Sequence, residues 1–358
     1  MAPADLVCPL LAIGAADRGV AGGKGASLGE LHRAGLPVPS GFVVTVPAFR
    51  RAMQGADPAA EIEAGIAALL PGDTGAIARA TAAFRARIVA APLPPDVAEA
   101  VTAAYEALGA AVPVAVRSSA VGEDAAEASF AGLQDTYLWV RGAGAVLDHV
   151  RRCWASLYST EAVSYRLRLR SRDQRGMPSR EIAMAVVVQQ MVDARSAGVM
   201  FTCSPTTGDR SVVAIEGSWG LGSVLVGGEV TPDSFVVSKV TGEILRRTVS
   251  DKVRLHRMAT DGSGTTAADV AADLRSLPCL SDAEIRALAR LGVDVERHYG
   301  TPQDVEWAVA GEQILLLQSR AETVWSTRPA RPLARPKARP MDHVFEQLSR
   351  PVLTRKEE

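Results

Sequence analysis

Cysteine and lysine are both scarce in this sequence of 358 residues, and each scarcity narrows what the protein can be. The four cysteines stand far apart, with no CxxC pair and no metal-ligand spacing. That pattern argues against a disulfide framework or a structural zinc site and is typical of a reducing compartment. Only five lysines occur, so Lys24, which stands among glycines, marks a segment of interest.

Long apolar runs and a charge imbalance are also absent. No hydrophobic stretch approaches the ~18 residues of a membrane span, and the first residues lack the basic start of a signal peptide. The formal net charge of −1 gives no overall electrostatic attraction to nucleic acid or acidic lipid. We therefore expect a cytoplasmic protein with no membrane or nucleic-acid partner.

The pattern of the residues that are present predicts an α+β protein. The length suits about two domains, and helical spacing marks residues 143–170 and 281–299. Neighbouring strands look like hairpins rather than regular βαβ units, which favours antiparallel sheets. The expected strands are short β-branched runs, at 112–119, 181–192, 197–202, 211–217, 234–240, 304–309 and 313–318.

Three segments differ from this pattern of short strands and helices. Residues 46–110 are alanine-rich with helical spacing, and we expect a helical insertion that serves as scaffold. Residues 326–340 repeat proline between basic residues, which is typical of a semi-rigid polyproline spacer. After it, an apolar stripe over residues 341–348 predicts a short helix that either folds back or docks on another protein.

The segment 304–320, DVEWAVAGEQILLLQSR, predicts a β-hairpin. A three-residue loop, 311–313, would place Glu306 opposite Gln318, on the face that also carries Arg320, whereas a two-residue loop would separate them. The same register puts Asp304 opposite Arg320. The other face, against the core, would carry the apolar side chains Trp307, Leu315 and Leu317.

The polar side chains on this face of the hairpin can be interpreted in two ways. A carboxylate, an amide oxygen and a guanidinium together suit a magnesium-bound polyphosphate. A solvated face with an exposed salt bridge accounts for the same residues.

Glycine-rich loops offer further phosphate-binding candidates. GGKGAS (22–27) lacks the Walker spacing, yet glycines around Lys24 let backbone N–H groups approach phosphate; a flexible turn is the alternative. Ser27 is expected to cap a helix that ends near Gly35. It also stands in GASLG, a match to GxSxG, but no apolar strand precedes it as a serine hydrolase requires.

A second candidate is AVRSSAVGED…SFAGLQDT (115–136). Arg117 ends a strand, and with Ser118 and Ser119 it could clamp a phosphate. The loop around Gly132 could lie over phosphates because glycine has no Cβ atom. SWGLG (218–222) is another glycine loop, but it fails the dinucleotide fingerprint.

Taken in order, these motifs resemble those of a known family. GGKGASLGEL…GLPVPSGFVVT, AVRSSAVGED…SFAGLQDTYL, QQMV…AGVMFT, GSWGLG…GGEVTPDSF and DVEWA…LLLQSR look like the nucleotide-binding domain of the dikinase-type phosphotransferases, over roughly residues 8–325. That group includes phosphoenolpyruvate synthase, pyruvate phosphate dikinase, rifampin phosphotransferase and the phenylphosphate synthases. The resemblance implies an ATP-grasp fold, in which two lobes with antiparallel sheets clamp ATP.

The resemblance also implies site residues and domains. Lys24, Arg117 and Arg320 would act on the phosphates, and Glu306 and Gln318 would hold Mg²⁺. The lid loop and the adenine hinge would comprise Gly132, Leu133, Gln134 and Thr136, and then Gln190, Met191 and Val192. The expected units are an N-terminal lobe at 1–192, a C-terminal lobe with the hairpin at 193–325, and a linker with a helix at 326–358.

Two departures from the family pattern shape the functional hypothesis. Leu133 stands where relatives often carry a polar residue, and none of the five histidines lies in the TSHAA-like setting of the phosphate-accepting histidine. The resemblance therefore implies an ATP-binding component that transfers the β,γ-diphosphoryl group of Mg-ATP to a histidine on a separate subunit or domain, releasing AMP. The alternatives are an ATP-sensing module without transfer and one domain of a longer enzyme, although TRKEE at the end reads as a natural terminus.

Overall fold

The computed structural model describes residues 5–57, 60–109, 111–121, 135–172, 183–262 and 264–325. Within them, helices and antiparallel strands are mixed, so the predicted α+β class is confirmed. The predicted linker and helix at 326–358 lie outside the described residues. In the part of the chain that is described, no helix is both long enough and apolar enough to cross a bilayer.

The first sheet has the strand order β1-β2-β5-β3-β4, and all its pairings are antiparallel. Its strand β5 carries the β-branched run predicted from the sequence, and every residue of it except the last is buried. The strands of this sheet are β1 (Val7–Pro9), β2 (Gly41–Val44), β3 (Val114–Ala120), β4 (Thr136–Val140) and β5 (Met184–Gln190).

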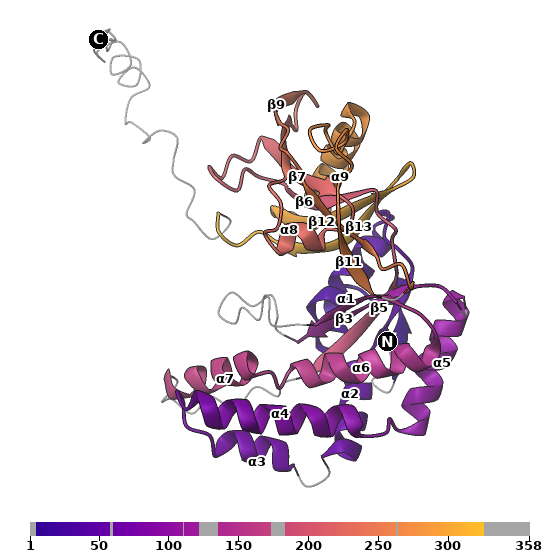
Figure 1. The fold of residues 1–358 in the computed structure, drawn as a ribbon, viewed down its shortest axis with the longest axis vertical. Coiled ribbons are helices and arrows are strands. Elements are labelled where there is room, and N and C mark those ends of the chain that lie inside the picture. Colours follow the sequence, from indigo (N-terminus) through magenta and orange to yellow (C-terminus); the bar gives the residue numbers. More distant parts are fainter. Residues whose placement is uncertain are drawn as a thin grey trace, which may run out of the picture.

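Helices cover the first sheet on the side away from the second (Figure 1). Residues 46–110 form most of this layer, as the alanine-rich pattern predicted, and share one hydrophobic core with the sheet. The predicted helix over 143–170 is two helices. The helices are α2 (Val46–Ala56), α3 (Glu61–Ala67), α4 (Thr74–Ala90), α5 (Pro95–Leu108), α6 (Ala143–Ser156) and α7 (Thr160–Arg172).

The second sheet has the order β13-β12-β6-β7-β8-β9 and is also antiparallel throughout. Helix α9 (Asp282–Tyr299) packs on it and begins with a capping box in which Ser281 and Glu284 satisfy each other's backbone N–H groups. The strands are β6 (Ser196–Phe201), β7 (Val212–Trp219), β8 (Asp233–Ser238), β9 (Ile244–Thr248), β12 (Gln303–Ala310) and β13 (Gln313–Ala321).

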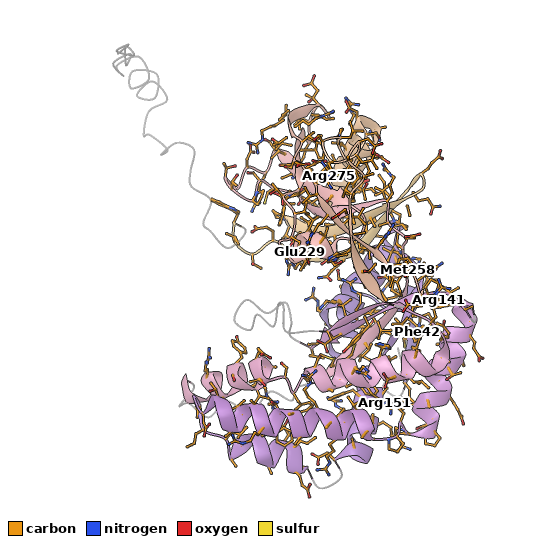
Figure 2. The ribbon with its side chains drawn as sticks, viewed as in Figure 1. Phe42, Arg141, Arg151, Glu229, Met258 and Arg275 are labelled. Carbon is orange, nitrogen blue, oxygen red and sulfur yellow. The ribbon has the colours of Figure 1, made fainter. Side chains whose placement is uncertain are left out.

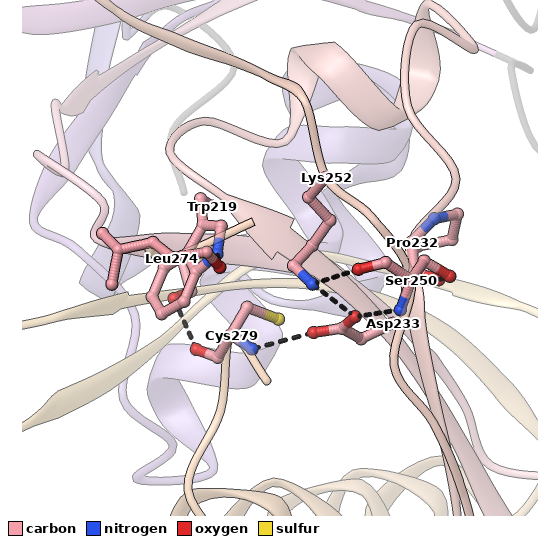
Figure 3. Close-up of polar contacts among 8 residues, drawn as sticks. Trp219, Pro232, Asp233, Ser250, Lys252, Leu274 and Cys279 are labelled. Carbon is pink, nitrogen blue, oxygen red and sulfur yellow. Dashed lines mark hydrogen bonds and ion pairs between the residues drawn. The ribbon is translucent and has the colours of Figure 1, made fainter. Parts of the chain in front are cut away.

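Two smaller elements leave the second sheet. Helix α8 (Ser223–Val226) follows β7, and the strands β10 (Arg254–Met258) and β11 (Thr265–Asp269) form a separate two-stranded ribbon. In Figure 1 the ribbon descends from the second sheet toward the first. Beneath the start of the ribbon, the fully buried Lys252 pairs with the fully buried Asp233 at 2.7 Å (Figure 3).

Helix α1 (Arg18–Arg33) lies between the two sheets (Figure 1), following the short 3-10 turns Leu10–Ala12 and Ala15–Asp17. It begins well before Ser27, so the expected cap at that residue is wrong. Ser27 is instead a buried mid-helix residue whose hydroxyl donates to the Ser319 carbonyl. That location also removes the serine-hydrolase reading, because the hydroxyl is neither exposed nor at a strand-to-helix turn.

Candidate functional site

A cavity of about 540 Å³ lies between the two larger sheets. Strands β3, β4 and β5 contribute one wall, and β6, β12, β13 and α8 contribute the other. All the predicted site residues that the structure describes line this cavity: Lys24, Arg117, Thr136, Gln190, Met191, Val192, Glu306, Gln318 and Arg320. The predicted lid residues Gly132, Leu133 and Gln134 lie outside the described residues.

Lys24 reaches the cavity because α1 is kinked at Gly22. Gly22 has φ 69°, and a Cβ atom there would lie 2.1 Å from the Ser119 carbonyl oxygen, so only glycine fits. After the kink, the Gly25 N–H donates to Ser119 Oγ at 3.0 Å, and that hydroxyl donates to the Ala21 carbonyl at 2.9 Å. Lys24 therefore stands at the start of the regular part of the helix, where anions are favoured.

Arg117 joins the first sheet to the hairpin of the second. Its Nη1 donates to the Leu317 carbonyl at 2.7 Å, and its Nη2 donates to Glu306 Oε2 at 3.0 Å and to Gln318 Oε1 at 2.8 Å. The arginine is 9% exposed, whereas the Glu306 side chain is 39% exposed. The guanidinium thus holds two of the predicted metal-ligand oxygens side by side at the cavity wall.

The hairpin achieves the predicted pairing by a different route. Its turn is two residues long, since Ala310 pairs with Gln313, so the expected three-residue loop is wrong. A bulge between Glu306 and Trp307 adds Leu317 to the second strand and restores Glu306 opposite Gln318. Bulges of this kind re-aim side chains next to functional sites.

The bulge also changes which residues face the cavity. Leu317 lines it, and Leu315 packs with Ala308 and Val192 at the same wall, so the expectation that both leucines face the core is wrong. Trp307 is fully buried in the second core, as expected. The extra residue explains the error, because it shifts the alternation of faces by one position along the strand.

Asp304 and Arg320 pair across the same hairpin, as the register predicted. Arg320 Nε and Nη2 both lie 2.8 Å from Asp304 Oδ2, and both residues line the cavity. Burial raises the pKa of Asp304, an effect that the Arg320 guanidinium opposes. The side chain of Arg320 is half exposed.

The two serines after Arg117 do not serve a phosphate clamp. Both are buried: Ser118 Oγ donates to the Asp135 carbonyl at 3.0 Å, and Ser119 Oγ holds the α1 kink. Their hydroxyls therefore position the backbone around the cavity and are absent from its lining.

The segment Gln190–Val192 connects the sheets at one end of the cavity. The Gln190 N–H donates to the Ser40 carbonyl and the Met191 N–H donates to the Pro113 carbonyl, each at 2.8 Å. These bonds fix the segment to two loops of the first sheet.

Several cavity residues were missed from the sequence. Gln189 is buried and its amide donates to the Pro39 carbonyl at 3.3 Å. The glycine loop SWGLG, rejected as a dinucleotide fingerprint, leads directly into the wall, and its glycines were the available signal. The missed lining residues on the second wall include Ala194, Ala197, Gly198, Leu221, Gly222, Ser223, Leu225 and Val226.

The donor set of the hairpin fits magnesium. Glu306 and Gln318 offer a carboxylate and an amide oxygen side by side, and both are hard ligands. Among the described residues, no group of three or more histidine, cysteine or acidic side chains could hold a metal. That is consistent with magnesium, which commonly takes one or two protein ligands and completes its shell with water and substrate phosphates.

Comparison with known proteins places these residues in a family context. The profile described as pyruvate phosphate dikinase, AMP/ATP-binding domain, matches residues 18–339 of the chain. Thus the match includes α1, the second sheet with its hairpin, and every strand of the first sheet except β1.

Three curated relatives illustrate the similarity. A probable phosphoenolpyruvate synthase of Methanothermobacter thermautotrophicus is 44% identical over 87% of this chain and 45% of the relative. A phosphoenolpyruvate synthase of Aeropyrum pernix is 40% identical over 88% of this chain and 42% of the relative. A rifampicin phosphotransferase of a Streptomyces species is 43% identical over 91% of this chain and 37% of the relative. The chain therefore spans less than half the length of these relatives.

Proposed function

Because the chain belongs to the pyruvate phosphate dikinase AMP/ATP-binding domain family, we propose that it is the ATP-grasp component of a dikinase-type phosphotransferase. It binds Mg-ATP and passes the β,γ-diphosphoryl group to a histidine on a separate subunit or domain, with release of AMP. The observation that carries the proposal is the gathering of residues from distant motifs around one cavity. The family match and the names of the relatives support nucleotide binding and phosphotransfer.

In this proposal the two lobes of the ATP-grasp fold are residues 1–192 and 193–325. ATP lies between them, with adenine at Gln190–Val192 and the phosphates at the hairpin. Since the N–H groups of Gln190 and Met191 already donate to other carbonyls, adenine meets the carbonyls of this segment and the Val192 backbone.

The chemistry rests on positioning and charge rather than on a covalent step in this chain. The bond between Pβ and the oxygen bridging to Pα breaks, a bond from the acceptor histidine nitrogen to Pβ forms, and AMP leaves with the bridging oxygen. Lys24, Arg117 and Arg320 stabilise the negative charge that develops on the phosphate oxygens. Glu306 and Gln318 would hold magnesium, which when bound would supply further charge neutralisation.

The identity of the adenine nucleotide product tests this proposal. The protein is incubated with Mg-ATP, alone and with histidine-bearing proteins that co-purify with it from the source cells, and AMP is separated from ADP. AMP formed only with such a protein, together with acid-labile phosphate on it, is the expected result. ADP would overturn the dikinase mechanism, and ATP bound without turnover would favour the sensing alternative.

A further inference from the structure

Among the described residues that line the cavity, Ser223 is the one serine. Its Oγ lies 2.8 Å from Nδ1 of His256, a residue of strand β10. On the other side of the imidazole ring, Nε2 lies 3.3 Å from Oε1 of Glu229. Figure 2 places Glu229 at the edge of the second-sheet part that faces the first sheet. A hydroxyl, an imidazole and a carboxylate thus stand in line, and of the three the Ser223 hydroxyl lies at the cavity wall.

The backbone holds this line in place. The Leu221 N–H donates to the His256 carbonyl at 2.9 Å, and a Cβ atom on Gly220, which has φ 76°, would lie 2.5 Å from that oxygen. The β10–β11 ribbon is anchored at its far end as well, where Met258 Sδ lies 3.9 Å from Arg141 Nη2 of the first-sheet part (Figure 2). His256 therefore contacts the loop before α8 through its backbone and α8 through its side chain.

The strand register tells which end of the cavity Ser223 occupies. Trp219, the last residue of β7, pairs with Ser196 at the start of β6, and the loop to Ser223 follows directly. Glu306 pairs with Val199, three residues further along β6. The loop that leads to Ser223 therefore leaves the sheet at the end where β6 begins. That end lies closer to Gln190–Val192 than Glu306 does. In a nucleotide held as proposed above, that position is closer to the ribose than to the metal-bound phosphates.

The position of the proton on the His256 ring determines whether the Ser223 hydroxyl can donate a hydrogen bond to a ligand or accept one from it. In the tautomer whose Nε2–H points at the Glu229 carboxylate, Nδ1 of His256 carries a lone pair. The Ser223 hydroxyl then donates its proton to Nδ1. Its oxygen lone pairs remain for the cavity, and a hydrogen-bond acceptor suits a ribose hydroxyl, which donates, better than a phosphate oxygen, which only accepts.

We propose that Ser223 accepts a hydrogen bond from the 2′- or 3′-hydroxyl of the bound nucleotide, and that His256 and Glu229 are positioning residues that keep its oxygen in the accepting state. The inference rests on the proposed function, since it places ATP in this cavity. It adds a sugar-discriminating contact to the phosphate and metal contacts described above.

Binding of ATP, 2′-deoxy-ATP and 3′-deoxy-ATP in the presence of Mg²⁺ tests the inference by calorimetry. One of the two deoxynucleotides should bind the wild-type protein roughly 3- to 10-fold more weakly than ATP, as expected for one neutral hydrogen bond. Ser223→Ala should abolish that ratio by weakening ATP alone. Ser211→Ala, which removes an exposed hydroxyl outside the cavity lining, should preserve it.

Variants of the histidine separate positioning from simple structural support. His256→Asn can place an amide oxygen near the position of Nδ1 and should retain much of the ratio, whereas His256→Ala should lose it. The matched control is His298→Ala, a more exposed histidine that is likewise paired with a glutamate, Glu30, away from the cavity lining. Thermal unfolding of each variant shows that the fold persists, because a change in ratio without a change in unfolding identifies positioning.

The outcomes distinguish this inference from the proposed function. If ATP binds but neither deoxynucleotide binds more weakly, or if Ser223→Ala leaves the ratio intact, the ribose contact is wrong while ATP binding stands. If the protein binds no ATP at all, both are overturned.

Discussion

Arg117 is the residue on which the candidate site converges. Its guanidinium contacts a carboxylate, an amide oxygen and a main-chain carbonyl of the hairpin at 2.7–3.0 Å. Lysine could not reproduce these contacts, because it lacks the planar fork of donors. The same fork matches phosphate oxygens. One side chain can thus organise the oxygens proposed to bind magnesium and, in the proposed complex, meet the nucleotide.

Glu306→Ala removes the carboxylate proposed to hold magnesium. We expect phosphotransfer to fall by on the order of 10²–10³ or more, as when one preorganised charge-stabilising group is lost, while the fold survives. Product formation under saturating Mg-ATP is the measurement. Glu312→Ala, at the exposed tip of the same hairpin, is the control and should be unaffected. Wild-type turnover in Glu306→Ala would remove this residue from the metal site.

Lys252 has a structural role, outside the candidate site. Its Nζ is fully buried and contacts Asp233 Oδ1 at 2.7 Å and the Ser250 carbonyl at 2.8 Å, while Asp233 also accepts from the Ser250 and Cys279 N–H groups (Figure 3). Lys252→Met leaves the buried Asp233 carboxylate without its positively charged partner, so we expect a loss of about 3–5 kcal/mol in unfolding free energy.

Urea unfolding measures this loss against a second ion pair, which joins Lys239, just after β8, to Glu296 of α9. Lys239→Met breaks a more exposed ion pair with Glu296, so it should cost about 1 kcal/mol or less. If the two variants lost equal amounts of unfolding free energy, burial would not determine how much the Lys252–Asp233 ion pair contributes to stability.

At the scale of elements, the hairpin and α1 determine the geometry of the site. The bulge in β12–β13 frees the Leu317 carbonyl for Arg117 while it keeps Glu306 opposite Gln318. The kink in α1 brings Lys24 to the cavity beside β3. Both are local irregularities in otherwise regular elements, and both place polar groups that a regular element would direct elsewhere.

Gly22→Ala tests the kink. The new methyl group would meet the Ser119 carbonyl, and alanine strains at φ 69°, so we expect a loss of more than about 1 kcal/mol in stability and weaker ATP binding. Gly19→Ala is the control, because it lies in the same helix and its Cβ would meet nothing within 4 Å. The kink would be dispensable if Gly22→Ala bound ATP as tightly as Gly19→Ala.

At the scale of the whole molecule, the two sheets meet through few but specific connections. Arg117 joins β3 to the hairpin, α1 packs Leu31 into the second core, and the Leu316 N–H donates to the Pro37 carbonyl at 2.7 Å. Of these residues Arg117 lines the cavity, so a change in the relative position of the sheets would alter that part of the candidate site directly.

The segment 326–358 lies outside the described residues, and its proline-rich sequence predicts a spacer with a terminal helix. We propose that it tethers the histidine-bearing partner. Its deletion should weaken association with that partner by at least tenfold, because an intramolecular tether raises effective concentration, and should leave ATP affinity unchanged. Association and ATP binding are both measured by calorimetry. Unchanged association would rule out the tether.

Much of the fold was predictable because its signals are local. The β-branched runs of β3, β5, β6 and β7 and the periodicity of α9 depend on residues a few positions apart. Strands β10 and β11 escaped prediction because Arg254–Met258 and Thr265–Asp269 carry almost no buried apolar face.

The sequence by itself determined the chemical inventory: a lysine among glycines, an arginine in a strand, and a hairpin with a carboxylate opposite an amide. The expectation that the strand ends at Arg117 is wrong, because β3 continues through Ser118 and Ser119 to Ala120. Only the tertiary structure decided how these groups meet. The Arg117 contact with Leu317 spans 200 residues, and the line from Ser223 through His256 to Glu229 joins separate elements. Such contacts depend on how packed elements approach one another, which no short-range pattern encodes, whereas strand and helix patterns follow from neighbouring side chains alone.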